Sequence, residues 1–309
     1  MALRNSPVGS PRTPHRLAVE LGVVTAALVG VLLWERFVME ATAAVFGTPG
    51  AFDSLLVNGL VNAAVLLGGL VAFVSGYAAV RDLDVGLRLP TRGSLPVVAL
   101  AVVLPVSLVA LTKVVGVFTG VGFNGLVMTS VAADAALWPV ALVTGLGLLV
   151  GVPALVLTCQ VLVQRSFERV VAPMAAVVAT TLVAGFVMVS DTGGLASVPE
   201  TGPLAGVVLF VLLVAAALFV AERIDDNRIR ALAALPAVAV VVVVALSSVA
   251  EITSFAGALF GVSQVTVLAV AAYAYARTDS LLVPALAYAS FRLASRAVVV
   301  FFEAGVQSW

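Results

Sequence analysis

Long runs of apolar residues alternate with short polar connections along almost the whole chain. A run of about 20 apolar residues can cross roughly 30 Å of hydrocarbon as a helix. A lipid-facing backbone must satisfy its own hydrogen bonds, and the runs lack the alternation of a porin-like barrel, so each run is predicted to be helical. The predicted spans are residues 17–38, 57–80, 94–112, 137–163, 172–190, 203–221, 231–250, 255–276 and 281–302. The pattern therefore predicts an all-α, polytopic transmembrane helix bundle of about nine spans.

Composition supports the same class of protein. Of 309 residues, 62% are apolar and only 10% are charged, and the mean hydropathy is +1.20. A soluble core of this size needs far more polar surface, so the lipid bilayer is the expected environment. Residues 1–16 are rich in Pro, Ser and Arg and are predicted to form a disordered cytoplasmic tail. Residues 17–309 are predicted to form a single helical transmembrane domain.

The basic residues gather in alternate connections. The amino-terminal tail and the connections after the second, fourth, sixth and eighth spans hold Arg4, Arg12, Arg16, Arg81, Arg88, Arg92, Arg165, Arg169, Arg223, Arg228, Arg230 and Arg277. The other basic residues are Arg36, Lys113, Arg292 and Arg296. Cytoplasmic connections carry an excess of Lys and Arg. We therefore expect a cell-membrane protein with its amino terminus in the cytoplasm and its carboxyl terminus, Trp309, outside.

Histidine occurs once, as His15 in the tail, so the predicted spans contain none. Hydrolysis inside a membrane by a metal or a general base needs imidazoles or carboxylates that converge at one depth. No glycine-rich phosphate-binding loop opens a helix. The lone Cys159 lies in an apolar run, where packing is the usual role of a thiol. We expect no catalytic residue, no metal, no cofactor and no nucleic-acid partner.

One segment nevertheless resembles a family of membrane proteases. Residues 153–188 read PALVLTCQVLVQRSFERVVAPMAAVVATTLVAGFVM. They are similar to the CAAX prenyl endopeptidase and bacteriocin-processing (CPBP) family, in which Glu-Glu-x-x-x-Arg and a basic connection precede a helix that ends in Phe-x-x-x-His. An ungapped alignment places Leu155 and Val156 at the glutamates, Gln160 at the arginine, Ala184 at the phenylalanine and Met188 at the histidine. A shifted alignment places Cys159 and Gln160 at the glutamates, and Phe186 and Ser190 at the second motif.

A second segment resembles the last motif region of the same family. Residues 277–293 read RTDSLLVPALAYASFRL, and the family has an Arg-Thr-Gly-Ser-Leu-like turn, then a proline, then His-x-x-x-Asn. Tyr288 stands at the histidine position and Arg292 at the asparagine position. The CPBP-like regions thus lie near residues 153–190 and 273–293, and every catalytic position in them is changed.

The resemblance implies a protease-like helical core without protease chemistry. In the family the glutamate activates a water, and the histidines hold that water and the oxyanion. Their replacement implies a catalytically inactive relative that acts in the binding, assembly or regulation of a membrane-embedded peptide or protein partner. The alternative is a small-molecule or ion transporter. Spans interrupted at Pro105, Pro153, Pro236 and Pro284 favour that alternative, and the lack of an internal repeat disfavours it.

Two arginines stand inside the last predicted span. Tyr288, Arg292 and Arg296 are spaced i, i+4 and i+8 and therefore form a polar stripe on one helix face. Arg292 lies about 16 Å past the start of the span, near the bilayer centre. An unpaired cation there costs at least about 2.5 kcal/mol. We expect the stripe to face the bundle interior, where Arg292 pairs with a carboxylate or free carbonyls, or binds an anionic group. The Arg296 side chain can extend to the outer interface.

Overall fold

The computed structural model describes residues 14–46, 52–190 and 254–305. Between the last two ranges it describes only a few isolated positions. The described residues are helical or lie in connections, and their one β-bridge joins Leu87 and Ser280. The elements are α1 (Pro14–Phe46), α2 (Phe52–Arg81), η1 (Arg92–Ser94), α3 (Leu95–Thr119), α4 (Phe123–Val127), α5 (Leu137–Val156), η2 (Leu157–Gln164), α6 (Arg165–Glu168), α7 (Pro173–Ser190), α10 (Phe255–Thr278) and α11 (Leu282–Phe302). The all-α prediction is confirmed for this part of the chain.

Six of the described helices are long and apolar enough to cross a membrane: α1, α2, α3, the continuous helix α5–η2–α6, α10 and α11. They correspond to the first four and the last two predicted spans. Helix α7 coincides with the fifth predicted span, although its described apolar part, Pro173–Gly185, is shorter. The predicted spans 203–221 and 231–250 lie outside the described residues. The chain is therefore a multi-pass helical protein with membrane-type helices, and the count of nine stays a prediction.

Helix α1 is longer at both ends than the predicted span 17–38. It begins at Pro14, inside the predicted tail, because proline is well suited to a first helical position, where its missing N–H is not needed. It continues to Phe46 through a charged stretch in which Arg36 Nε donates to Glu40 Oε1 at 2.7 Å, one turn away. Such i, i+4 pairs support a helix that polarity alone would end.

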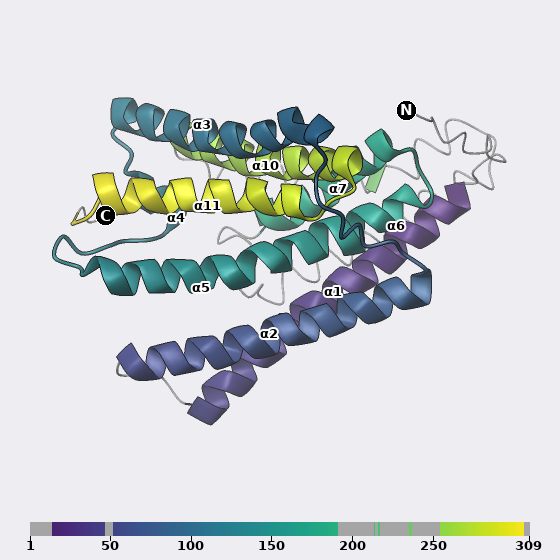
Figure 1. Ribbon diagram of the computed structural model, residues 1–309, viewed down its shortest axis with the longest axis horizontal. Coiled ribbons are helices and arrows are strands. Elements are labelled where there is room, and N and C mark those ends of the chain that lie inside the picture. Colours follow the sequence, from purple (N-terminus) through teal and green to yellow (C-terminus); the bar gives the residue numbers. More distant parts are fainter. Residues whose placement is uncertain are drawn as a thin grey trace.

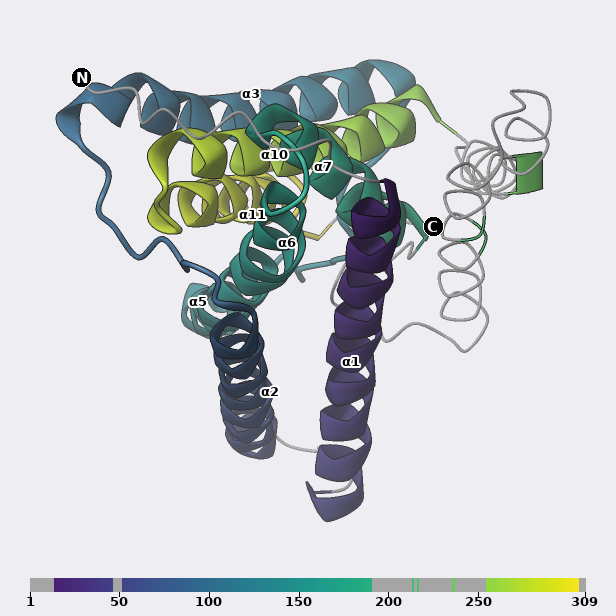
Figure 2. The same ribbon diagram turned by 90° about the vertical axis from the view of Figure 1, so that its right-hand side faces the viewer.

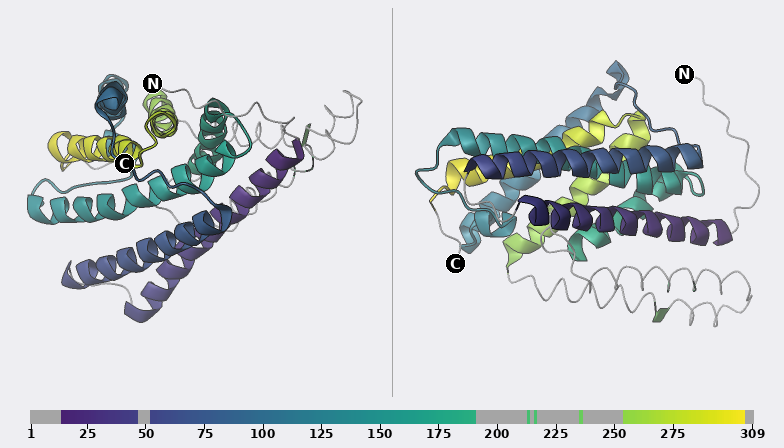
Figure 3. Two further views of the ribbon diagram at one scale, coloured as in Figure 1. Left: turned by 45° about the vertical axis from the view of Figure 1, so that its right-hand side comes forward. Right: turned by 90° about the horizontal axis from the view of Figure 1, so that it is seen from below.

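The helices form two groups that meet at η2. Helices α3, α10 and α11 pack on one another, with α7 against α10 and α5 against α11. Helices α1 and α2 form a pair that contacts η2 and diverges from the other group (Figures 1 and 2). Figure 3 shows the same separation, with α3, α10 and α11 on one side of the molecule and the α1–α2 pair on the other. The continuous helix α5–η2–α6 contacts both groups.

One end of the bundle, here called the Arg165 end, is held by ion pairs. Arg81, at the end of α2, donates through Nη2 to both carboxylate oxygens of Glu20 on α1, at 2.7 and 2.6 Å. The Tyr77 hydroxyl and the Ser166 hydroxyl are hydrogen-bonded at 2.6 Å. The connection 82–94 also lies here, because its Leu87 forms the bridge to Ser280.

The opposite end, here called the Glu303 end, is organised by one carboxylate. Glu303 follows α11 and forms an ion pair with Lys113 of α3, and it accepts from the Phe123 N–H at 2.8 Å and from the Asn124 N–H. Burial alone would raise the pKa of Glu303, but these three hydrogen bonds outweigh burial and lower the pKa. Because the folded-state pKa is lowered, this contribution to stability is present at neutral pH and is lost as the pH falls through that pKa.

Each described helix can be assigned a direction from these ends. Helix α7 starts beside α6 at the Arg165 end, whereas α10 starts at the Glu303 end, where Phe260 contacts Phe123 edge to face at 5.8 Å. Helices α1, α3, α7 and α11 run away from the Arg165 end, and α2, α5 and α10 run toward it. The basic connections that alternate in the sequence therefore gather at the Arg165 end wherever the structure describes them.

Candidate functional site

The segments that resemble the protease family meet in the centre of the bundle. Leu155 and Val156 of α5, Ala184 of α7 and Tyr288 of α11 belong to one cluster of buried residues, and each is at most 6% exposed. Cys159 of η2 is part of the same cluster. Met188 lies on α7, but its side chain is outside the described part of the structure. Residues separated by more than 130 positions in the sequence thus come together.

A hydrogen bond joins the two polar motif positions. Gln160 of η2 and Tyr288 of α11 are buried, and Gln160 Nε2 donates to the Tyr288 hydroxyl at 3.0 Å. The Gln160 Oε1 atom has no partner within the described ranges. The centre of the motif region is therefore a small group of neutral polar atoms enclosed by apolar side chains.

The local shape of η2 puts these polar atoms in the core. Residues Leu157–Gln164 form a π-helix, and Thr158 to Gln164 are all buried. Widened helical turns of this kind are frequent at functional sites. Gln160 and Gln164 are one turn apart, and Gln164 Nε2 donates to the Ala272 carbonyl of α10 at 2.9 Å. The two glutamines therefore attach η2 to both α11 and α10.

This centre offers hydrogen bonds but no strong base. Its amide (Gln160), phenol (Tyr288) and thiol (Cys159) are neither carboxylates nor imidazoles. Across the described ranges, no three His, Cys, Asp or Glu side chains come close enough to hold a metal ion. The amide, phenol and thiol can orient helices and present an amide oxygen. They do not activate a water, because neutral groups do not supply the charge that this step needs.

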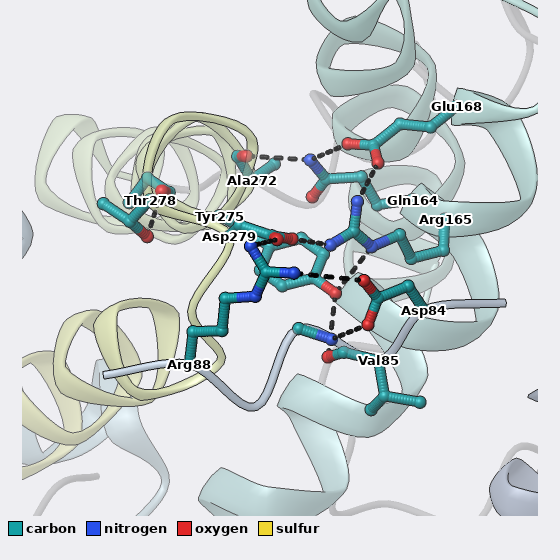
Figure 4. A network of polar contacts seen from close by, with 12 residues as sticks. Asp84, Val85, Arg88, Gln164, Arg165, Glu168, Ala272, Tyr275, Thr278 and Asp279 are labelled. Atoms are coloured by element: carbon teal, nitrogen blue, oxygen red, sulfur yellow. Dashed lines mark hydrogen bonds and ion pairs between the residues drawn. The ribbon is translucent and has the colours of Figure 1, made fainter. Parts of the chain in front are cut away.

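A second polar network was not predicted from the sequence. Arg165 Nε donates to the Tyr275 hydroxyl at 2.8 Å, Nη1 to Glu168 Oε2 at 2.8 Å, and Nη2 to Asp279 (Figure 4). The guanidinium also lies 4.5 Å from the centre of the Tyr275 ring. The Tyr275 hydroxyl in turn donates to the Val85 carbonyl at 3.1 Å. Arg165 therefore connects α6, α10 and the connection 82–94.

The turn between α10 and α11 places the carboxylate in this network. Asp279 has a left-handed backbone conformation, with φ 50°, and caps α10. Gly86, with φ +62°, packs so closely that a Cβ there would lie 3.0 Å from both Arg165 and Asp279. From the sequence, Arg165 is predicted only to be a basic residue of a connection. Its i, i+3 spacing to Glu168 is the one local signal of the network.

The polar stripe of α11 is divided between two surroundings. Tyr288 is in the central cluster, whereas the guanidinium of Arg292 lies against Gly151 of α5. Arg292 and Arg296 are both half-buried. In the described part of the chain neither arginine forms an ion pair, so the predicted carboxylate partner of Arg292 is not found there. Arg292 contacts α5 at Gly151, and the prediction that the stripe faces the bundle interior stays a prediction.

Comparisons with protein-family models, with curated proteins and with solved structures found no match to this chain.

Proposed function

We propose that this chain is a catalytically inactive relative of the CPBP membrane proteases that binds a membrane-embedded peptide or protein segment and acts in its assembly or regulation. One observation carries the proposal: the positions aligned with the family's separate motifs meet in one buried cluster that holds Leu155, Val156, Ala184 and Tyr288. An active centre needs its motif residues to converge. A relative that kept the protease scaffold and lost its catalytic residues would still bring these positions together. Because fold does not fix function, the binding role is tested below.

The turn before α11 is compatible with the resemblance. The family's turn has a glycine where this chain has Asp279, and Asp279 takes up the left-handed conformation, φ 50°, that glycine adopts most easily. Helices α3 and α4 also end in this conformation, at Gly120 and Met128. The carboxylate of Asp279 in addition binds Arg165. The turn is thus compatible with the glycine-containing turn of the family and adds a contact of its own.

We propose a cell-membrane orientation with the Arg165 end in the cytoplasm. The basic residues of the described connections gather there, as the positive-inside rule requires of a cytoplasmic face. The amino terminus would then be cytoplasmic and the carboxyl terminus outside. Two reporter enzymes are fused in turn after Trp309, one that is active only outside the cytoplasm and one that is active only inside it. We expect activity from the first and none from the second. A cytoplasmic signal would contradict the proposed orientation, because α1 starts at the Arg165 end and α11 runs away from it (Figure 1).

The proposed function predicts binding without cleavage. The full chain, purified and reconstituted in lipid nanodiscs, is offered a farnesylated CAAX peptide that carries a photoreactive group. We expect no release of the terminal tripeptide above that from empty nanodiscs, because the cluster supplies no base. We expect saturable crosslinking that an excess of unlabelled farnesylated peptide removes. Mass spectrometry measures both products.

Matched variants separate the outcomes of this experiment. Tyr288→Phe removes the hydroxyl that accepts from Gln160, and Tyr273→Phe, whose ring contacts Arg277, is the control. Tripeptide release that is lost in Tyr288→Phe but kept in Tyr273→Phe would contradict the proposed inactivity. Crosslinking no stronger than in empty nanodiscs would contradict the proposed binding and favour the transporter alternative.

A further inference from the structure

One face of α11 carries three polar side chains beyond the central cluster. Arg292, Ser295 and Arg296 are three and four residues apart, so they lie on the same side of the helix. Arg292 is ten residues, or about 15 Å, past the first residue of α11, and Arg296 is about 9 Å before its last residue. This face, here called the arginine face, therefore reaches from the middle of the span toward the Glu303 end.

A glycine makes room for the inner arginine. A Cβ at Gly151 of α5 would lie 2.9 Å from Arg292 Nη1 and 3.4 Å from Arg292 Cζ. The first distance is shorter than ordinary contact, so the guanidinium end of the Arg292 side chain would have to shift if residue 151 carried a Cβ. Gly145 and Gly147, on the same helix, have nothing within 4 Å. Arg292 therefore packs against α5 at Gly151.

The arginine face lacks the acidic partners that other interior cations have. Arg81 pairs with Glu20, Lys113 with Glu303, and Arg165 with Glu168 and Asp279. Arg292 and Arg296 form no ion pair with any residue that the structure describes, and they carry like charges one helical turn apart. Two unpaired cations in a low-dielectric interior repel each other and attract an anion.

A buried hydroxyl, that of Ser295, lies three residues after Arg292 on the same helix. Ser295 is 4% exposed, and its Oγ has no hydrogen-bond partner among the described residues. Other serines of these helices donate to the carbonyl one turn back, as Ser290 does to Leu286 at 2.6 Å and Ser263 to Leu259 at 2.7 Å. A buried hydroxyl without a partner loses free energy, so a ligand oxygen at this face would satisfy it.

We propose that the arginine face binds the phosphate or carboxylate group of an anionic lipid. Guanidinium groups bind both anions through paired N–H donors, and the Ser295 hydroxyl is a second type of donor. The site lies at membrane depth, where an anion arrives most readily on an apolar chain. The ligand class is thus an acidic phospholipid or a fatty acid, and this site is separate from the Gln160–Tyr288 cluster.

The test uses the delipidated full chain in a neutral detergent. Phosphatidylglycerol, oleate, phosphatidylcholine and inorganic phosphate are added in turn, and native mass spectrometry and the unfolding temperature report binding. We expect phosphatidylglycerol and oleate to bind and to raise the unfolding temperature, and phosphatidylcholine to do neither. The Arg292→Leu, Arg296→Leu double variant should bind the anionic lipids about 10- to 100-fold more weakly, the loss expected for charge-assisted hydrogen bonds.

Three further variants keep the proposal open to refutation. Gly151→Ala displaces Arg292 without removing charge and should weaken lipid binding, whereas Gly147→Ala has free space and should not. Arg36→Leu removes an arginine already paired with Glu40 and should leave binding unchanged. Unchanged binding of phosphatidylglycerol in both Gly151→Ala and the double arginine variant would overturn the proposal. So would an equal effect of inorganic phosphate at the same concentration, or a destabilisation of the double variant that is the same with and without anionic lipid.

Discussion

Replacing Arg165 with leucine is expected to lower the free energy of unfolding by about 3 kcal/mol, at the lower end of the range for breaking a buried ion pair. The loss would leave Glu168 and Asp279 without their cation, and the three side chains are 20%, 14% and 38% exposed. The partial exposure of Asp279 is the reason for choosing the lower end. The variant would also lose the hydrogen bond and the ring contact to Tyr275. Unfolding in detergent, followed by circular dichroism, measures the change.

Arg169→Leu is the matched control for this prediction. Arg169 is exposed, four residues further along the chain, and its loss removes the same charge from the same end of the bundle. We expect a change within about 0.5 kcal/mol, as for most surface substitutions. Hydrogen exchange adds a local measure, because the Leu281 amide donates to the Gly86 carbonyl at 3.2 Å and should exchange faster only in Arg165→Leu. Equal effects of the two substitutions would show that net charge, and not the network, is responsible.

Most of the helical framework could be predicted from the apolar runs. Six predicted spans coincide with membrane-type helices because a run of this length leaves the backbone no other way to satisfy its hydrogen bonds in lipid. The ends were less predictable. Helix α1 continues past residue 38 since Arg36 and Glu40 pair on its surface, and hydropathy alone does not register such a pair.

The candidate site was predictable only in part. The resemblance brought together residues around Gln160 and Tyr288, and the structure places a hydrogen bond between them. The Arg165 network depends on the left-handed turn at Asp279 and on the path of the connection at Gly86. Both features fix contacts across more than 70 residues of sequence. A pattern of apolar and polar positions does not predict such contacts.

The predicted pairing of Arg292 shows a different limit. Its depth and its helix face follow from spacing, and it contacts α5 at Gly151. The nature of its partner does not follow from spacing. An ion pair and a bound lipid anion both relieve the cost of a buried cation, and the sequence contains the same residues in either case. Only the arrangement of neighbouring carboxylates, seen here for Arg81 and Lys113, distinguishes them.

Replacing Gly69 with alanine is expected to lower the free energy of unfolding by about 1–3 kcal/mol, the usual cost of overpacking. A Cβ at Gly69 of α2 would lie 2.2 Å from Trp34 Cζ2 on α1, so the indole must move. That movement would also break the hydrogen bond from Trp34 Nε1 to the Leu66 carbonyl, which is 3.2 Å long. Small residues let membrane helices approach closely, and Gly69 does this for the α1–α2 pair.

Gly68→Ala provides the control one residue away. Nothing lies within 4 Å of a Cβ at Gly68, and alanine favours a helix more than glycine does, so this variant should be at least as stable as the parent chain. Thermal unfolding gives both stabilities, and the emission of Trp34 reports the movement of the indole in a background where the other two tryptophans, Trp138 and Trp309, are replaced by phenylalanine. A Gly69→Ala variant with unchanged emission and the same stability as Gly68→Ala would mean that α1 and α2 are not in contact at Trp34. In that case the α1–α2 pair would have to be held by its Arg165 end alone, where Arg81 binds Glu20.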